Sequence, residues 1–222
     1  GSSGSDDCQQ PPFSLQQLGA EIAPLLADGL TDSWSQVRYT ASVATRTFMQ
    51  CLGTHAARAP FYAHLLPPMC LNRYYVAEGV RGYSQETWQQ VMGDQGRPAL
   101  AAHIDQVASY YIAQSKAVNH SVREAACACM AELAEKVSRE AVEPHMAAML
   151  RALLMCFKDM AWPVRDAACV ACGRCVLAYP EACRPQLGEL LDLWVAHLWD
   201  NVQSVRENSA RALADALRAY PD

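Results

Sequence analysis

Apolar residues recur at helical spacing along most of the chain. Between residues 146 and 157 they stand at positions 0, 3, 4, 7, 8 and 11 counted from Met146, and the stretch 187–198 repeats the pattern from Leu187. A stripe of this kind covers one face of an amphipathic α-helix. The stretches that begin at Leu15 and Leu100 fit the same template. The hydrophobic pattern therefore predicts four helices of one kind, spread over the whole chain.

The second recurring feature is a Val-Arg pair followed by small residues. Successive arginines lie 43, 42, 42 and 41 residues apart (81 − 38, 123 − 81, 165 − 123 and 206 − 165). Small side chains four and seven residues after each valine would let a neighbouring helix approach closely. The pairs are Val37-Arg38, Val80-Arg81, Val122-Arg123, Val164-Arg165 and Val205-Arg206. The residues at the two later positions are Ala41 and Ala44, Ser84 and Thr87, Ala126 and Cys129, Ala168 and Ala171, and Ser209 and Ala212.

The two patterns alternate, so one unit of about 42 residues occurs five times along the chain. This period predicts an all-α fold, an α-α superhelix (solenoid) of about five helical hairpins. We expect the hairpins at approximately 14–53, 60–92, 97–137, 140–179 and 183–220, within a single domain that spans 14–222. Residues 1–5 are interpreted as a cloning scar and residues 6–13 as a disordered tail, which suggests a piece excised from a larger protein.

A helix, a turn that begins with aspartate, and then a Val-Arg pair in an alanine-rich helix together resemble the HEAT repeat of the armadillo-like superfamily. In that family the turn aspartate and the second-helix arginine pair into a ladder through the stack. Tyr75 and Ala117 stand at the aspartate position of the second and third units, so we expect an interruption there. The resemblance places Asp32, Arg38, Arg81, Arg123, Asp159, Arg165, Asp200 and Arg206 in the ladder, with Asp159 as the partner of Arg165.

Composition and motifs argue against catalysis. The net charge is −5, whereas the HEAT-like DNA glycosylases need a basic surface for phosphate. None of the six histidines is followed by glutamate, unlike the paired His-Glu motifs of the HEAT-like di-iron hydroxylases. A phosphate-binding glycine loop and a nucleophile motif are also missing. We therefore expect no enzyme, no cofactor and no nucleic acid, membrane or small-molecule partner, with a HEAT-like glycosylase or other enzyme as the less favoured alternative.

The ten cysteines are interpreted as core residues. Five of them stand among alanines of the small-residue helices, where a free cysteine behaves as a small apolar side chain: Cys127, Cys129, Cys169, Cys172 and Cys175. Cys169, Cys172 and Cys175 are spaced by three along one helix, without a second CxxC or a nearby histidine to complete a zinc site. The sequence thus predicts no metal and a reducing compartment, the cytoplasm, with the nucleus also compatible.

The second unit departs from the repeat. Its Pro67-Pro68 pair is expected to end or kink the first helix at Leu66. This unit carries the large aromatic residues Tyr74, Tyr83 and Trp88, and the last two stand where other units carry smaller groups. Sequences tend to break local rules at functional sites, so these residues are candidate anchors for a partner. In the alternative interpretation, Trp88 fills the space that the kinked helix leaves.

The turns between the two helices of each unit form a second candidate surface. Trp34 and Trp162 both fall in such turns. A tryptophan in the first turn resembles the TOG domains, HEAT arrays that bind tubulin through their turns, which makes a tubulin-binding domain the alternative function. The later turns, however, lack the lysines and arginines that TOG domains present. Each indole could instead close the end of its own unit.

A third candidate surface is acidic. Glu124, Asp166 and Glu207 directly follow the arginine in the last three units, and stacking would bring them into a row, with Glu132 and Asp215 further along the same helices. Such a row could orient a basic segment of a partner, or it could be a solvated face that also contacts the neighbouring arginines. Taken together, the sequence predicts a non-catalytic protein-binding scaffold or adaptor module that recognises a protein or peptide partner on its concave face or its turn ridge.

Overall fold

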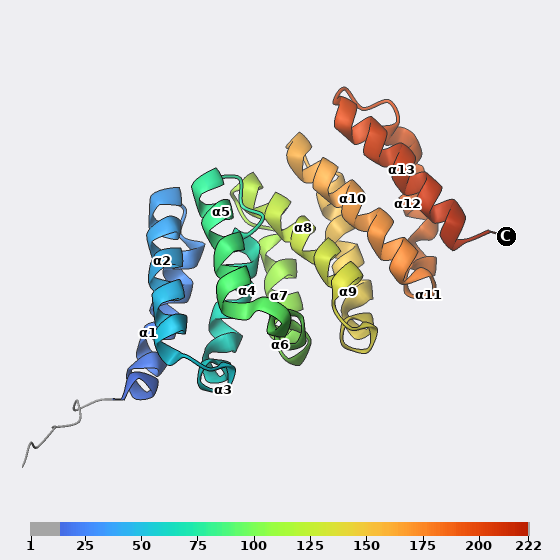
Figure 1. Ribbon diagram of the computed structural model, residues 1–222. Coiled ribbons are helices and arrows are strands. Elements are labelled where there is room, and N and C mark those ends of the chain that lie inside the picture. Colours follow the sequence, from blue (N-terminus) through green and yellow to red (C-terminus); the bar gives the residue numbers. More distant parts are fainter. Residues whose placement is uncertain (1–13, 222) are drawn as a thin grey trace, which may run out of the picture.

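The computed structural model describes residues 14–221, which form a row of helical hairpins (Figure 1). The predicted all-α solenoid is confirmed, and the described residues contain no strand. The first helices of the hairpins are α1 (Leu15–Thr31), α4 (Tyr62–Asn72), α7 (Ile104–Gln114), α9 (Arg139–Phe157) and α12 (Leu187–His197). The second helices are α2 (Ser35–Leu52), α5 (Glu78–Thr87), α8 (His120–Lys136), α10 (Trp162–Ala178) and α13 (Gln203–Ala219). The expected scar and tail, residues 1–13, lie outside the described part.

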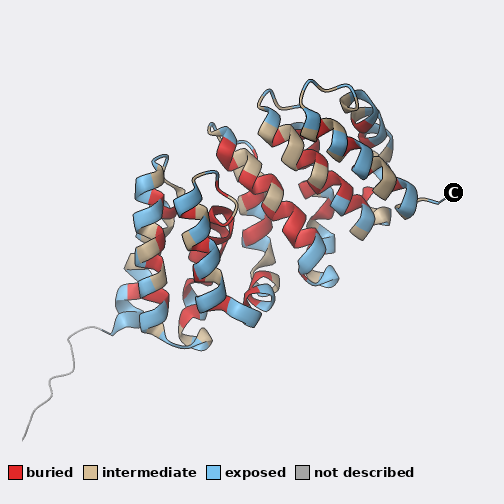
Figure 2. Ribbon diagram, turned by 45° about the horizontal axis from the view of Figure 1, so that its top comes forward, coloured by how far each residue is buried: buried red, intermediate tan, exposed pale blue. Residues whose placement is uncertain are grey.

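Short helical segments connect the hairpins. They are α3 (His55–Arg58), η1 (Ala59–Phe61), η2 (Trp88–Met92), η3 (Gly93–Gln95), α6 (Gly96–Ala102), α11 (Pro180–Cys183) and η4 (Arg184–Gln186). Two layers result, one of first helices and one of second helices, and buried residues concentrate where the layers face each other (Figure 2).

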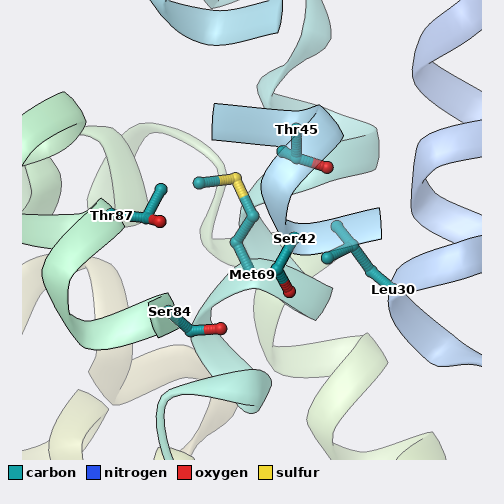
Figure 3. Close-up of a pocket in the computed structure, with 6 residues that line it drawn as sticks. All are labelled: Leu30, Ser42, Thr45, Met69, Ser84 and Thr87. Atoms are coloured by element: carbon teal, nitrogen blue, oxygen red, sulfur yellow. The ribbon is translucent and has the colours of Figure 1, made fainter. Parts of the chain in front are cut away.

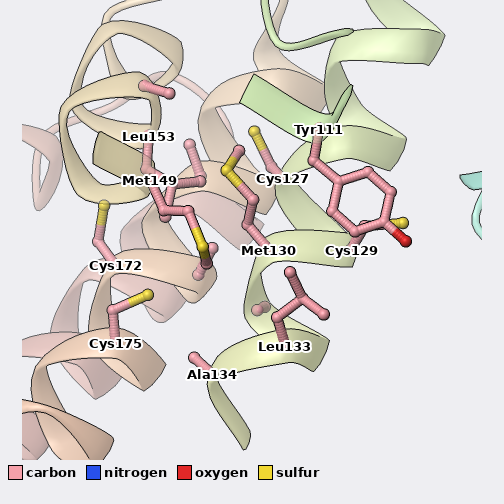
Figure 4. Close-up of a cluster of buried hydrophobic side chains, with 14 of the residues drawn as sticks. Tyr111, Cys127, Cys129, Met130, Leu133, Ala134, Met149, Leu153, Cys172 and Cys175 are labelled. Carbon is pink, nitrogen blue, oxygen red and sulfur yellow. The ribbon is translucent and has the colours of Figure 1, made fainter. Parts of the chain in front are cut away.

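The apolar stripe of α9 explains how a hairpin enters the stack. All six of its members, from Met146 to Phe157, are at most 5% exposed. Figure 4 shows Met149 and Leu153 of α9 beside Met130 and Leu133 of α8 and Cys172 of α10. On the other side, small residues of α8 and α10 are fully buried and bring these two helices together. Large side chains from the first helix thus fill the space that small side chains on the second helices leave.

The first unit differs in register from the prediction. Val37 and Ala44, which were expected to face the stack, are exposed. Five positions of α2 are buried: Arg38, Ser42, Thr45, Phe48 and Met49. All but Phe48 lie 42 residues before a buried residue of the second unit, namely Val80, Ser84, Thr87 and Val91. The extra residue in the 43-residue spacing therefore turns α2 by one position about its axis.

The second unit is irregular, but its first helix does not end at Leu66 as expected. Helix α4 continues through both prolines to Asn72. Pro67 and Pro68 are buried, so their packing offsets the two backbone hydrogen bonds that they remove. The distortion lies elsewhere: α5 ends at Thr87 in the π-helical turn η2, and the predicted stripe of the third unit is divided at His103 into α6 and α7.

The buried side chains form two clusters that meet in the second unit. The smaller cluster joins α1, α2 and the start of α4, and the larger one extends from the end of α4 to α13. The Trp88 side chain packs against both clusters. Beside it, Arg73 donates two hydrogen bonds to the carboxylate of Glu132, and both residues are less than a tenth exposed. This buried ion pair joins the second unit to the third.

The arginine of every Val-Arg pair is the fourth residue after the N-cap of its second helix, and its guanidinium binds back to the preceding turn. In each unit it donates to the carbonyl six residues earlier, at distances from 2.6 Å (Arg38 to Asp32) to 3.4 Å (Arg81 to Tyr75). Such carbonyls at the end of a helix have no partner within the helix. The arginine therefore fixes the turn between the two helices.

In the later units the same guanidinium also binds the next hairpin. Arg123 donates from Nε and Nη2 to Asp159 at 2.7 and 2.9 Å, and Arg165 donates in the same way to Asp200 at 3.1 and 3.2 Å. Each aspartate thus pairs with the arginine of the preceding unit, which corrects the expected pairing of Asp159 with Arg165. The rise between stacked units brings each arginine level with the following turn.

The ladder changes its chemistry in the first units. The Arg38 guanidinium lies 4.3 Å from the ring centre of Tyr75 and donates to the Asn72 side chain at 2.7 Å. Arg81 faces the unit with Ala117 at the aspartate position, and it has no ion pair among the described residues. Arg–Asp pairs therefore connect the third, fourth and fifth units.

Replacing Arg165 with alanine should lower the free energy of unfolding by about 1 to 3 kcal/mol, because the Asp200 carboxylate keeps only the Val202 N–H as a donor and two turn carbonyls lose their arginine donor. Arg174→Ala is the matched control, since Arg174 pairs with Glu135 on the surface. Urea unfolding followed by circular dichroism measures both. Equal effects of the two substitutions would show that the ladder adds nothing beyond a surface ion pair.

The ladder should also make stability depend on pH. Hydrogen bonds from Arg123 lower the pKa of Asp159. For Asp200, burial raises the pKa, but the hydrogen bonds from Arg165 and the Val202 N–H, together with nearby positive charge, lower it overall. A lowered carboxyl pKa stabilises the fold above the unfolded value of about 3.9, and this contribution is lost as pH falls through the folded value. Asp159→Asn keeps an acceptor for the Ala161 N–H. The difference in free energy of unfolding between wild type and Asp159→Asn should therefore be largest near pH 6 and decrease towards pH 3. A difference that stays constant over this range would contradict the assignment.

Candidate functional site

The turns between first and second helices line up along one edge of the stack and expose large apolar side chains (Figure 1). We call this surface the turn ridge and define it by Trp34, Val76, Val118, Met160 and Trp162. Their exposed fractions are 70%, 55%, 102%, 97% and 49%. Trp34, Val76, Val118 and Met160 recur every 42 residues, so the ridge repeats with the fold.

The turn ridge is rigidly supported. The carbonyls of Val76, Val118 and Met160 each accept a hydrogen bond from the ladder arginine of the same unit. Asp32 and Asp159 also accept the N–H two residues later, at 2.7 and 2.8 Å. With the backbone held from the inside, the apolar side chains of these turns point to solvent. An exposed apolar row of this kind is typical of a protein interaction site.

Neither ridge tryptophan closes the end of its own unit. Trp34 is the N-cap residue of α2, and Trp162 begins α10 directly before Pro163. Sequence reasoning singled out both residues but missed Val76, Val118 and Met160, as well as Trp199, which is 86% exposed in the last turn. The available signal was an apolar residue just before the N-cap of a second helix, where no helix packing requires one.

The aromatic residues of the second unit are packed within the fold. The Trp88 indole lies 4.1 Å from the Arg73 guanidinium, and a Cβ built on Gly96 would stand 2.3 Å from its ring. Tyr83 lies under the Arg46 guanidinium at 3.6 Å and against the Tyr39 ring at 5.4 Å. Burial raises the pKa of Tyr74, which stays half-buried beside the Arg73–Glu132 pair. The structure favours the interpretation of Trp88 as a filler of the irregular unit.

The acidic row is only partly assembled. Burial raises the pKa of Glu124, and the charge of Asp166 adds to this effect, whereas His120 and Arg81 oppose it, so the Glu124 and Asp166 carboxylates interact electrostatically. Asp166 accepts a hydrogen bond from Asn208, whereas Glu207 accepts one from Gln203 of its own helix. Glu132 is not on this face, since it is buried against Arg73, and Asp215 pairs with Arg218. A compact acidic pair therefore replaces the expected row.

Among the cysteines of residues 14–221, Cys51 is exposed, which corrects the expectation of a core position for it, and the others are buried. Burial raises the pKa of the Cys172 thiol well above its usual range and that of Cys169 to about 12, so both stay protonated. No cluster of three or more metal-ligating side chains occurs among residues 14–221. Figure 3 shows a cavity between α2 and α5, lined by Ser42, Thr45 and Thr87 among others. Its volume of about 10 Å³ fits one water molecule.

None of the described helices is long and apolar enough to cross a membrane.

Comparison with known proteins agrees with this architecture. No protein-family model matches the chain, and no curated protein matches it in sequence. Among solved structures it is similar to a designed armadillo repeat protein in complex with the peptide (KR)4, with a TM-score of 0.56, 16% identity, and coverage of 91% of this chain and 85% of that one. It is also similar to importin beta, with a TM-score of 0.61, 14% identity, and coverage of 92% of this chain but 26% of that one. The chain therefore has a HEAT/armadillo-like repeat fold.

The two kinds of tryptophan should respond differently to truncation. Trp88→Ala should lower the free energy of unfolding by about 3 kcal/mol, because it removes the side chain that packs against both core clusters. Trp162→Ala should change it by no more than about 0.5 kcal/mol, because the indole is half exposed on the turn ridge. Urea unfolding of the two variants decides the point, and a larger loss for Trp162→Ala would show that its indole is structural.

Proposed function

We propose that this protein is a non-catalytic, protein-binding scaffold or adaptor module that recognises a protein partner through the turn ridge. The observation that supports this most strongly is the 42-residue recurrence of exposed Trp34, Val76, Val118 and Met160. A single exposed apolar residue is ordinary on a protein surface, but a row of them held on fixed turns is not.

The physical basis of recognition is burial of this row on a partner. Covering apolar surface contributes about 25 cal/mol per Å², although ordering and lost motion offset much of the gain. Two features reduce that cost. The turn backbones are already fixed by the ladder arginines, and tryptophan buries a large area with few rotatable bonds. The partner surface that fits such a ridge is an apolar groove or helix face.

A second surface of the same module is the acidic pair on the second helices. Burial is the main cause that raises the Glu124 pKa, and the Asp166 charge adds to it, so a positive group beside the two carboxylates would stabilise their charged forms. The solved structure of a designed armadillo repeat protein with the peptide (KR)4 gives a precedent for a basic peptide on this fold. We propose that this acidic pair orients a basic segment of the partner, whereas burial of the turn ridge provides the affinity.

The ridge favours an apolar protein partner over tubulin. A tubulin-binding surface of the TOG kind would present lysines and arginines at the later turns. Here those turns carry Val118 and Met160, and Lys158 is engaged by Glu189 at 2.7 Å. The buried free thiols suit a reducing compartment such as the cytoplasm.

The test compares a ridge variant with a control in which glutamate also replaces an exposed apolar side chain. Val118→Glu combined with Met160→Glu places charge on the ridge at residues that are almost fully exposed, so the fold should be retained. Met155→Glu is the matched control, because Met155 is 70% exposed on α9, outside the turns. Each protein is used to capture partners from cell lysate, with quantitative mass spectrometry as the readout.

We expect at least one protein to be captured by wild type and Met155→Glu and to fall by about tenfold or more with the ridge variant. Retention of every captured protein by the ridge variant would overturn the assignment. Purified tubulin is assayed separately by co-sedimentation. Binding that survives the ridge substitutions but is lost in Glu124→Gln, Asp166→Asn would place recognition on the acidic pair instead.

A further inference from the structure

The Arg–Asp ladder has an open position at each end of the described stack. The Asp200 carboxylate accepts hydrogen bonds from the Val202 N–H and from Arg165 of the preceding unit, and the Asp200 carbonyl accepts one from Arg206. In the same way, the Asp32 carboxylate accepts a hydrogen bond from the Trp34 N–H, and the Asp32 carbonyl accepts one from Arg38. However, no guanidinium within residues 14–221 binds the Asp32 carboxylate. Asp32 therefore has the same local hydrogen bonds as the aspartates of the ladder, but no arginine within the described residues pairs with its carboxylate.

Arg206 is the complementary half. It donates to the Asp200 carbonyl at 2.7 Å, as Arg123 and Arg165 do to theirs, but the described part of the chain provides no carboxylate for its remaining donors. A planar guanidinium held in this way is oriented for bidentate pairing with a carboxylate on the next hairpin.

The apolar side chains around Arg206 are also uncovered. Leu191 and Val195 occupy the stripe positions of Leu150 and Leu154 in α9, where those side chains are at most 5% exposed, but here they are 37% and 52% exposed. On α13, Leu217 is 72% exposed, although the equivalent residue of α10, eleven after the ladder arginine, is fully buried. The face of α12 and α13 therefore has the surface that interior units bury against a following hairpin.

The opposite end exposes the other flank of the stripe. Leu15, Leu18 and Leu25 in α1 stand where α9 has Met146, Met149 and Cys156, which are all buried. In the interior this flank faces the preceding unit, as shown by the Cys156 thiol, which lies 3.4 Å from the Ser115 carbonyl. The two ends thus expose the two halves of one repeat-to-repeat interface.

We propose that the α12–α13 face of one molecule binds the α1–α2 hairpin of a second copy, head to tail, with Arg206 paired to Asp32 across the interface. The occupant must be a helical hairpin whose turn carries an acid that is not already in a ladder pair. Within the described residues only the α1–α2 hairpin meets this requirement. The inference concerns the end faces and does not depend on the function proposed for the turn ridge.

Docking by the repeat interface would join different surfaces of the two copies. A heterologous contact of this kind does not close into a symmetric dimer, so it produces linear oligomers whose length rises with concentration. Because one charge pair is shared at each junction, association should weaken as salt rises.

The experiment is sedimentation velocity on the full chain over a range of protein concentrations, at low and high salt. Wild type should move from monomer to larger species as concentration rises. Arg206→Glu and Asp32→Lys should each weaken association about tenfold or more, since both place like charges at the junction. An equimolar mixture of the two variants, and the double variant Asp32→Lys, Arg206→Glu, should restore association, because the pair is then reversed.

Arg211→Glu is the matched control, with the same charge change on an exposed residue of α13, five positions from Arg206. Circular dichroism checks that each variant is folded, and Asp32→Asn, which keeps an acceptor for the Trp34 N–H, replaces Asp32→Lys if that variant is not. A wild-type protein that stays monomeric at every concentration overturns the proposal. So does association that Arg211→Glu weakens as much as Arg206→Glu, or that the charge reversal fails to restore.

Discussion

The arginine in the first turn of each second helix is the contact on which the rest of the structure depends. The end of a helix leaves carbonyls without partners, and a sharp turn between two helices exposes several of them at once. A guanidinium has enough donors to bind these carbonyls and, where an aspartate is present, the following hairpin as well. One side chain therefore fixes the angle within each hairpin and, in the third and fourth units, also the register with the following hairpin.

This arrangement also explains how the surfaces divide. Because the arginines hold the turn backbones from inside, the residues just before each second helix have no packing role and face solvent. The aromatic residues of the second unit are in the opposite situation. Trp88 and Tyr83 lie against guanidinium groups and complete an irregular junction. Large aromatic residues that stand out equally in the sequence thus have different roles: those in the turns are exposed, whereas those of the second unit pack against guanidinium groups.

The fold could be predicted from the sequence because the information is periodic. The Val-Arg spacing and the α9 stripe each define a helix face, and the same face recurs in most units. The rotation of α2 could not be predicted, since Arg38 follows a valine as its counterparts do, and only burial distinguishes it. The ladder partner was also ambiguous, because Asp159 lies six residues before Arg165 in sequence while the stack places it beside Arg123. Local spacing does not determine which turn is level with which arginine.

The candidate site was harder to predict than the fold. The tryptophans of the ridge were visible because an indole in a turn is unusual, but Val118 and Met160 are ordinary residues whose significance comes from their common exposure. Sequence reasoning placed Glu124, Asp166 and Glu132 on one acidic surface, whereas Glu132 pairs with Arg73 in the core and only Glu124 and Asp166 influence each other's charge. A long-range ion pair of this kind leaves no trace in the spacing of residues along a helix.

The division of the buried side chains into two clusters has a consequence for how the molecule melts. In a stack, each unit is stabilised by its immediate neighbours, so cooperativity extends only as far as the interfaces between them are strong. The smaller cluster meets the larger one through Trp88, which packs against both, without the close approach of second helices that joins α8 to α10. The first hairpins can therefore open while the later ones remain folded, so that amide hydrogens of α1 and α2 would exchange by partial opening and those of α10 only by global unfolding.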